Sequence, residues 1–321
     1  METEYLAEQM RPYITQTPLL LSQRLSDRFN ANVYLKMENR QVGGSIKARG
    51  GFAKILSQPD QKYYTTASSG NHGISFSMAS QALGCSVDIF VPTQTSPLKI
   101  KKIKDCGANL ILKGRSWDEA NDACMQHAET SGAEYVNSFN DDCINEGYST
   151  AAHEVVTVLP KIDVFLCSIG GGSIITGMSR LVKKFNPNAR IYGVETYGAH
   201  SMRLSMEAGH PVSLPEITSA ATSLGIKKPS QKMFDGVRQF VDGLAVVSDH
   251  DAHKVQKDFW NENHEIIELA ASCNIAALKN GLVPDVEGKN VVVLICGGND
   301  FEESLEKTYP NTKINEPFLN T

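Results

Sequence analysis

Long hydrophobic runs are absent from this sequence of 321 residues. No stretch approaches the roughly 18 consecutive apolar residues that a membrane-spanning helix needs. The first eleven residues carry three acidic side chains, whereas a signal peptide begins with basic residues followed by an apolar run. We therefore expect a cytoplasmic protein with no membrane partner.

Paired cysteines are absent as well. The seven cysteines are an odd number, no two of them form a C-x-x-C pair, and most lie inside apolar segments. The eight histidines show no spacing typical of transition-metal ligands. This pattern predicts reduced thiols rather than a disulfide framework or a zinc site.

The sequence has only a small excess of charge of one sign. Lys and Arg together number 31 and Asp and Glu 36, which gives a net charge of −5. The basic residues are scattered, apart from a short stretch that contains Lys99, Lys101, Lys102 and Lys104. Because nucleic-acid-binding proteins present clustered basic surfaces, we expect no nucleic-acid partner.

Short β-branched or aromatic runs alternate with longer helical patterns along the chain. This alternation is typical of βαβ units and predicts an α/β fold with a largely parallel sheet. In one expected helix, residues 116–132, Ser116 is placed to cap the N-terminus and Gly132 to end the helix. The expected strands span residues 63–67, 87–91, 109–112, 164–169, 190–195 and 290–296.

Three glycine-bearing segments follow expected strands, at residues 68–73, 170–173 and 296–299. In open α/β sheets, ligands bind beyond the carboxyl ends of the strands, where loop amides and helix N-termini meet. The three segments therefore predict one shared site.

The middle segment, Gly170, Gly171, Gly172 and Ser173, is the strongest candidate for binding an anion. It precedes an expected helix at residues 174–184, so backbone N–H groups and the helix dipole both favour a phosphate. A tight turn without a ligand remains the alternative. Neither a G-x-G-x-x-G dinucleotide pattern nor the Gly-Lys-Ser/Thr of a Walker loop is present here.

A lysine among small residues is the second chemical signal. Lys47 lies in the segment GGSIKARG, residues 43–50, near an expected helix start. A surface lysine is the simplest interpretation of this segment alone. Together with a phosphate-binding loop, and without a nicotinamide or Walker pattern, it suggests pyridoxal phosphate, whose aldehyde needs a Schiff-base amine.

These motifs make the sequence similar to the fold-type II pyridoxal-phosphate enzymes, and among them to serine and threonine dehydratases of the liver type. The resemblance implies two open, twisted, mostly parallel sheets flanked by helices. It also implies a small domain, residues 57–140, inserted into a large domain, residues 1–56 and 141–321. The resemblance lies in segments 17–19, 45–50, 68–72, 170–172, 195–201, 212–219 and 296–299.

The resemblance further implies a role for each candidate site residue. Lys47 would carry the cofactor as a Schiff base and remove the α proton of the substrate. The glycines of residues 170–172 and Ser173 would hold the phosphate, Asn71 would bond the ring hydroxyl, and Cys296 would face the pyridine nitrogen. The substrate carboxylate would be held by the loop of Ser68, Ser69, Gly70, Asn71 and His72.

A cation site is implied by the same resemblance. Glu195, Ala199 and Ser201 match its pattern, and Leu224 and Ile226 would add carbonyl oxygens. One carboxylate with neutral oxygens suits potassium better than magnesium or calcium, which prefer more anionic ligands. An ion pair between Glu195 and a neighbouring base is the alternative.

The predicted function is that of an ammonia-lyase acting on L-serine and L-threonine, giving pyruvate or 2-oxobutanoate and ammonia by β-elimination. A thiol at Cys296 cannot stabilise a protonated pyridine nitrogen as an aspartate would, so the cofactor would be a weaker electron sink. A less stabilised carbanion favours prompt loss of the β-hydroxyl. We also expect a homodimer.

Three alternatives stay open. Ser69 is alanine in liver-type dehydratases but serine in serine racemases, so racemisation of serine or hydroxyaspartate is the main alternative. A β-replacement synthase is less favoured for two reasons. Synthases more often carry an aspartate-arginine pair after the lysine, and they more often have a serine at the ring nitrogen. A non-catalytic cofactor-binding module is disfavoured by the presence of Lys47.

Overall fold

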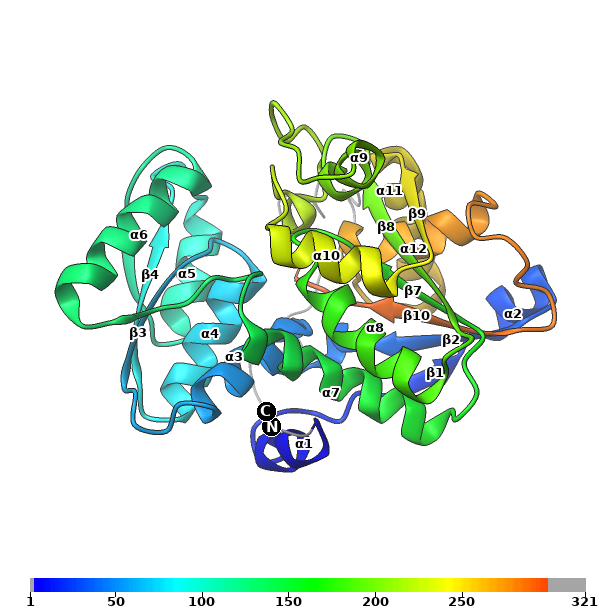
Figure 1. Cartoon of the computed structure of the whole chain (residues 1–321), viewed down its shortest axis with the longest axis horizontal. Helices are drawn as coiled ribbons and strands as arrows, with labels where there is room; N and C mark the ends of the chain where they lie inside the picture. The colour runs from blue at the N-terminus through cyan, green and yellow to red at the C-terminus, as the bar shows by residue number, and fades with distance from the viewer. Residues whose placement is uncertain (1–2, 300–321) are drawn as a thin grey trace.

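The computed structural model describes residues 3–299 and shows two lobes, each built around its own β-sheet (Figure 1). The smaller lobe contains the strands found between residues 63 and 135, and the larger lobe contains the remaining strands. No helix in the described part of the chain combines the length and the apolar character needed to cross a membrane.

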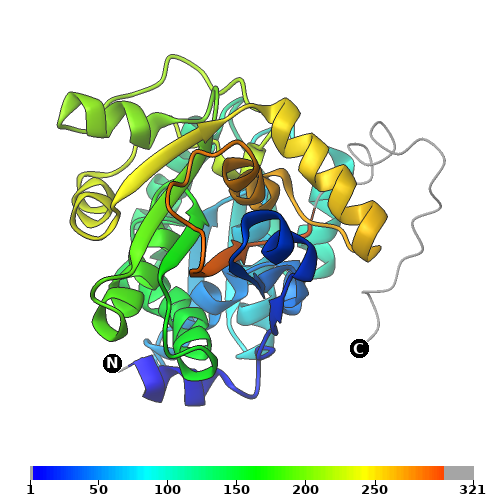
Figure 2. The ribbon, with the colours of Figure 1, turned by 90° about the vertical axis from the view of Figure 1, so that its right-hand side faces the viewer.

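The larger lobe is built on a six-stranded sheet with the order β1-β2-β10-β7-β8-β9. All neighbouring strands run parallel except β1, which pairs antiparallel with β2 at one edge. Figure 2 shows the opposite edge strand, β9, in yellow. The strands are β1 (Leu19–Leu21), β2 (Asn32–Met37), β7 (Val164–Ser168), β8 (Arg190–Thr196), β9 (Gly243–Val247) and β10 (Asn290–Ile295).

The smaller lobe is built on a four-stranded, all-parallel sheet with the order β5-β4-β3-β6. Its strands are β3 (Tyr63–Ala67), β4 (Ser86–Val91), β5 (Asn109–Leu112) and β6 (Glu134–Tyr135). These strands fall within the stretch predicted to form the small domain. The predicted boundaries at residues 56/57 and 140/141 stay a prediction, and residues 1–2 and 300–321 of the predicted large domain lie outside the described residues.

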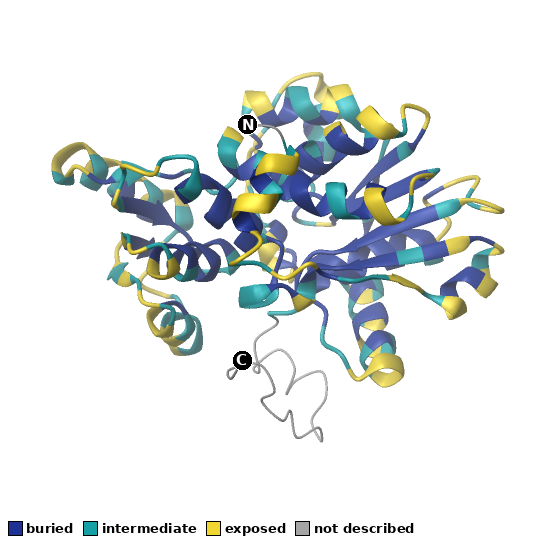
Figure 3. Cartoon of the chain, turned by 90° about the horizontal axis from the view of Figure 1, so that it is seen from below, coloured by how far each residue is buried: buried dark blue, intermediate teal, exposed yellow. Residues whose placement is uncertain are grey.

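Helices cover both sheets. The first part of the chain contributes α1 (Thr3–Met10), α2 (Gln23–Phe29), α3 (Lys47–Leu56), α4 (Asn71–Ala82), α5 (Pro97–Asp105) and α6 (Trp117–Ser131). The second part contributes α7 (Asp142–Val158), α8 (Ser173–Phe185), α9 (Ser201–Ala208), α10 (Gln231–Phe240), α11 (Asp249–Asn263) and α12 (Leu269–Lys279). Short 3-10 turns lie at η1 (Glu38–Arg40), η2 (Val42–Gly44) and η3 (Thr222–Leu224). Figure 3 shows the strands of the large sheet as buried, with exposed residues concentrated on outer loops and helix surfaces.

The predicted α/β class is confirmed, and so is the helix expected at residues 116–132. Ser116 caps α6 by accepting a hydrogen bond from the Glu119 amide, and Gly132 ends it in the left-handed conformation with φ 77°. Four strands were not predicted, namely β1, β2, β6 and β9. In β2 the buried Lys36 interrupts the apolar pattern, and β6 has only two residues, which is too short to carry a periodic signal.

The charge of Lys36 is part of a buried ionic network that joins β2, α3 and α7. Arg49 on α3 is fully buried and donates two hydrogen bonds to Glu38, at 2.8 and 2.9 Å. It also donates to Glu154 on α7 at 2.8 and 2.9 Å, while Lys36 donates to Glu154 and to the Thr17 carbonyl. Burial by itself raises the pKa of Glu38, but Arg49 and Lys36 outweigh it, so the pKa lies below its usual value.

We predict that Glu38→Gln lowers the free energy of unfolding by about 3 kcal/mol at neutral pH, because it leaves buried cations short of a partner. The Glu38 carboxyl has a lower pKa in the folded protein than in the unfolded chain. Its contribution to the free energy of unfolding is therefore complete above the unfolded pKa of about 4.5, and is lost as the pH falls through the folded pKa. Urea unfolding should therefore show a difference between the two proteins that shrinks in acid.

The matched control is Glu207→Gln, which removes an exposed ion pair with Arg203 and should cost less than about 1 kcal/mol. Equal losses for the two variants would contradict a stabilising role for the buried network.

Candidate active site

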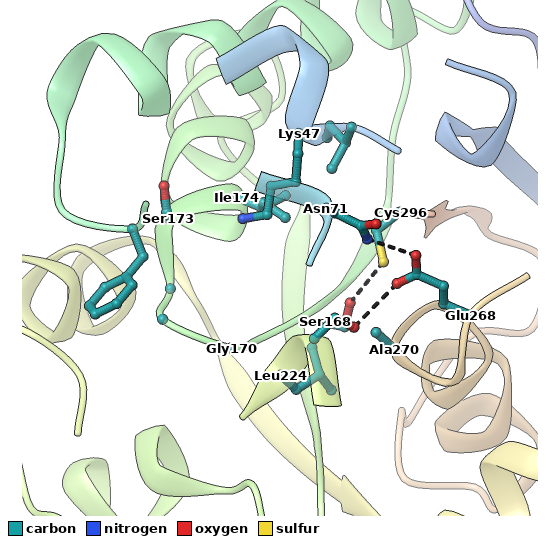
Figure 4. A pocket seen from close by; sticks show the side chains of 15 residues that line it. Lys47, Asn71, Ser168, Gly170, Ser173, Ile174, Leu224, Glu268, Ala270 and Cys296 are labelled. Carbon is teal, nitrogen blue, oxygen red and sulfur yellow. Dashed lines mark hydrogen bonds between the residues drawn. The ribbon is translucent and has the colours of Figure 1, made fainter. Parts of the chain in front are cut away.

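A cavity lies beyond the carboxyl ends of β7 and β10 (Figure 4). Its lining includes residues at the N-termini of four helices, namely Lys47 of α3, Asn71 of α4, Ser173 of α8 and Glu268, which caps α12. Helix N-termini favour anions, because their first N–H groups have no partner within the helix. The arrangement is therefore suited to a small anionic ligand.

The predicted phosphate loop forms one wall of this cavity. A Cβ atom on Gly171 would lie 2.6 Å from the side chain of Phe139, and one on Gly170 would lie 3.2 Å from the Leu224 Cα atom. Gly172 has φ +94°, a conformation that side chains with a Cβ rarely adopt. Close contacts and backbone conformation together require glycine in this loop, which presents backbone to the cavity.

Ser173 begins α8 directly after the glycines and is buried. Its hydroxyl donates a hydrogen bond to the Asn145 side-chain oxygen on α7. The hydroxyl is thus engaged with protein, which leaves the backbone amide as the group of Ser173 that an anion can use.

Lys47 extends its amine into the same cavity from the first turn of α3 (Figure 4). Burial lowers the pKa of this amine to about 8, although Cys296, Cys167 and Glu268 act in the opposite direction. A lysine with this pKa is partly unprotonated near neutral pH. It can therefore serve both as a nucleophile and as a base.

Beside Lys47, Glu268 joins its own segment of the chain to three others. Its Oε1 atom accepts hydrogen bonds from Asn71 Nδ2 at 2.7 Å and from the Asn299 amide at 3.0 Å, and its Oε2 atom accepts one from Ser223 at 3.2 Å. Asn299 Nδ2 in turn donates to Asn71 Oδ1 at 3.0 Å. These bonds fix which end of the Asn71 amide is the donor and hold it at the cavity wall.

Cys296 follows β10 and lines the cavity opposite the glycine loop. The Ser168 hydroxyl donates to its sulfur at 3.6 Å, as drawn in Figure 4. Burial, followed by the charge of Glu268, raises the pKa of the thiol to about 12. Cys296 is therefore a neutral thiol at physiological pH.

The predicted carboxylate loop, residues 68–72, is less uniformly placed. Within it, Asn71 lines the cavity, whereas Ser68, Ser69, Gly70 and His72 are not part of its wall. The Ser68 hydroxyl accepts a hydrogen bond from the Gly70 amide at 3.3 Å.

His72 is buried and neutral. Burial, and then the charge of Lys47, lowers its pKa to about 3. The Thr66 hydroxyl donates to the Val136 carbonyl at 2.7 Å, so at 3.2 Å from His72 Nε2 it accepts the ring proton. His72 thereby ties the loop to the small sheet.

The three predicted cation residues lie outside the cavity but close to each other. Glu195 is on β8, Ala199 is in the turn that follows, and Ser201 is the first residue of α9; all three are buried. The Ser201 hydroxyl donates to the Ile226 carbonyl at 2.7 Å. Two residues before Ile226, Leu224 lines the cavity, so the two sites share a loop.

Glu195 is held by the first turn of α9. Its two oxygens accept hydrogen bonds from the amides of Met202, at 3.0 Å, and Arg203, at 2.8 Å. Burial raises its pKa to about 8, although these amides act in the opposite direction. No cluster of three or more His, Cys, Asp or Glu side chains suited to a metal occurs among the described residues. A cation here would rely on one carboxylate and neutral oxygens.

Comparison with known proteins identifies the family. The family model described as pyridoxal-phosphate dependent enzyme matches residues 10–297, which is most of the chain. The chain belongs to this family. The resemblance noted from the sequence motifs, and the fold it implied, are confirmed.

Relatives of this pyridoxal-phosphate enzyme include a protein named L-threonine ammonia-lyase from Geobacter sulfurreducens. It is 34% identical, over 91% of this chain and 73% of the relative. A mouse protein named serine dehydratase-like is 33% identical, over 92% of this chain and 94% of the relative. The solved serine racemase of Dictyostelium discoideum superposes with a TM-score of 0.86 at 25% identity, covering 93% of this chain and 97% of the racemase.

The described residues fit the cofactor of the family. Pyridoxal phosphate needs an amine for its aldehyde and donors for its phosphate. The cavity contains one lysine with a lowered pKa, and a glycine loop, with no room for side chains, at the N-terminus of α8. Both requirements are met on opposite walls of one cavity.

Sequence reasoning missed Ser223 and Phe139 as parts of this wall, and it did not commit Glu268 to the site. Glu268 precedes the apolar run of α12. The family resemblance places a turn near the cofactor ring at residues 268–272, but the sequence there departs from the common E-P-x-x-G pattern, so the position of Glu268 stayed open. Its partners come from segments up to 197 residues away, so only the tertiary structure reveals it.

We predict that Glu268→Ala lowers the free energy of unfolding by about 2 kcal/mol, because the Asn71 and Asn299 donors lose a charged acceptor. Ser223→Ala is the matched control, since it removes only the longest of the three bonds and should cost about 1 kcal/mol or less. Urea unfolding of the two variants decides the matter. A smaller effect for Glu268→Ala than for Ser223→Ala would contradict the linking role of the carboxylate.

Proposed function

We propose that this enzyme catalyses β-elimination on L-serine and L-threonine, giving pyruvate or 2-oxobutanoate and ammonia. The observation that carries the proposal is the lysine of lowered pKa facing a glycine phosphate loop across one cavity. The names of the Geobacter and mouse relatives support this choice of reaction and substrates.

Pyridoxal phosphate, when bound, supplies an aldehyde for the substrate amine and an electron-withdrawing ring that weakens the bond to the α proton. Lys47 would hold that aldehyde and would accept the α proton of the substrate on its Nζ atom. Its pKa of about 8 allows both roles near neutral pH, because the amine can lose and regain a proton there.

The remaining residues bind and orient. Backbone groups of Gly170, Gly171, Gly172 and Ser173 would hold the phosphate. Asn71 would donate to the ring hydroxyl with the amide hydrogen that Glu268 leaves free. Cys296, a neutral thiol, would face the ring nitrogen. The loop of residues 68–72, of which Asn71 lines the cavity, would hold the substrate carboxylate through its amides and hydroxyls.

We predict that Lys47→Arg abolishes oxo-acid formation, because arginine keeps the positive charge but can neither form the Schiff base nor act as a base near neutral pH. Turnover of L-serine and the absorbance band of the Schiff base should vanish together. The matched control is Lys104→Arg, an exposed position on α5 that should change neither signal. Substantial turnover by the Lys47 variant would reject the assignment.

We also propose a monovalent cation, potassium, held by Glu195 and by neutral oxygens of Ala199, Ser201, Leu224 and Ile226. The support is that these residues meet at the end of β8 and that only one of them is a carboxylate. A cation there would stabilise the loop that carries Leu224 into the cavity.

We expect turnover to rise with added potassium, to survive EDTA, and to lose its potassium response in Glu195→Gln. Activity that stops with EDTA and returns with magnesium alone would contradict the monovalent site.

The racemase alternative depends on Ser69, whose hydroxyl would return a proton to the other face of the substrate carbon. The fold is shared with the solved Dictyostelium racemase, so the architecture is compatible with either outcome. We predict that Ser69→Ala keeps oxo-acid formation from L-serine within about tenfold, a barrier change of roughly 1.4 kcal/mol or less. Enantiomer analysis beside pyruvate release measures both reactions. Faster interconversion of L- and D-serine than elimination in the wild type, abolished in the variant, would make racemisation the main activity.

Three further proposals concern the protein as a whole and rest on the sequence analysis: a homodimer, a cytoplasmic location, and a small domain at residues 57–140. Sedimentation velocity tests the dimer, and cell fractionation tests the location. Hydrogen exchange with and without substrate tests whether residues 57–140 respond as one unit, as a separate domain would.

A further inference from the structure

An aromatic ring lies against the amine of Lys47. Lys47 Nζ is 5.1 Å from the ring centroid of Tyr148, within the distance of about 6 Å at which a ring face attracts a cation. Tyr148 belongs to α7 and is fully buried. Water is therefore excluded from the ring side of the contact, while Lys47 is half-buried at the cavity.

Close helix packing places the ring there. A Cβ atom on Gly147 would lie 2.4 Å from the Arg49 carbonyl, so α7 meets the backbone of α3 at this point. A Cβ atom on Gly50 would lie 2.9 Å from two ring atoms of Tyr148. Lys47 and Gly50 are three residues apart and share one face of α3, so the ring covers the face from which the amine extends.

The hydroxyl of Tyr148 does not explain its position. It is buried without a hydrogen-bond partner among the described residues, and burial raises its pKa, so it stays a neutral phenol. What Tyr148 offers to Lys47 is the negative face of its ring.

We propose that Tyr148 is a positioning residue that stabilises the protonated amine of Lys47 through its ring face. The catalytic consequence rests on the proposed function. When the Cα–H bond of the substrate breaks and the proton forms an N–H bond on Lys47, a cation appears in a buried cavity, and the ring stabilises that cation at the moment it forms.

Other titratable groups act on the same amine. Cys296 and Glu268 line the cavity beside it, and Cys167 and His72 lie within electrostatic range of it. On the Tyr148 side, Asp141 at the start of α7 acts on the tyrosine, and it is paired with Lys54 of α3 at 3.1 Å. A test must therefore change the ring alone and leave these groups in place.

The experiment replaces Tyr148 with phenylalanine and with its mono-, di- and trifluorinated forms, which keep the ring shape while weakening its negative face. In the full-length protein without cofactor, the pH dependence of Lys47 labelling by a small amine-reactive reagent, read by mass spectrometry, gives the pKa of the amine. We expect a stepwise fall of about half to one unit from phenylalanine to the trifluorinated form. Tyr148→Phe itself should match the wild type.

The same series is then measured with pyridoxal phosphate bound, where the acid limb of the kcat profile should move to lower pH by a similar amount. Thermal midpoints should stay constant, because shape is preserved. A Lys47 pKa that is equal across the series, or that follows the thermal midpoint instead of fluorine number, would overturn the proposal. The measurement without cofactor does not depend on the reaction, so failure of the proposed function would appear separately in Lys47→Arg.

Discussion

The active site depends on the close packing of α3 against α7. Gly147 brings the two backbones together, and Arg49, two residues after Lys47, is held by Glu38 and Glu154 from opposite sides. An arginine fully enclosed in this way can shift little without leaving buried charges unpaired. The start of α3, and with it the Lys47 amine, is thereby fixed relative to the large sheet.

Burial at this position has a chemical result. Desolvation lowers the pKa of Lys47 towards neutrality, while the carboxylate of Glu268 and the ring of Tyr148 keep the cationic form accessible. An amine that must alternate between neutral and protonated forms needs this balance. A more polar cavity would leave the lysine permanently charged, and a wholly apolar one would prevent it from accepting a proton.

Glu268 provides the second constraint, because it connects the two lobes at the cavity. Asn71 begins α4, which follows β3 of the small sheet, whereas Ser223 and Asn299 belong to loops of the larger lobe. A single carboxylate thus sets the orientation of the Asn71 amide and bonds to both lobes at this point. On the neighbouring loop, Leu224 lines the cavity and the Ile226 carbonyl accepts a hydrogen bond from Ser201, so one loop contacts both the cavity and the start of α9.

The sequence by itself determined the features that depend on local pattern. The α/β class, the capped helix α6 and the glycine loop before α8 follow from periodicity, capping residues and backbone freedom, and all are present. Motifs also selected Lys47, Asn71 and Cys296, which the structure brings to one cavity. Strand β2 escaped prediction because its buried Lys36 is tolerable only when Glu154 and a carbonyl from elsewhere in the chain bind it. Tyr148 escaped, and the placement of Glu268 stayed open, for the same physical reason: what they do depends on partners distant in sequence, and only tertiary packing determines which side chains meet.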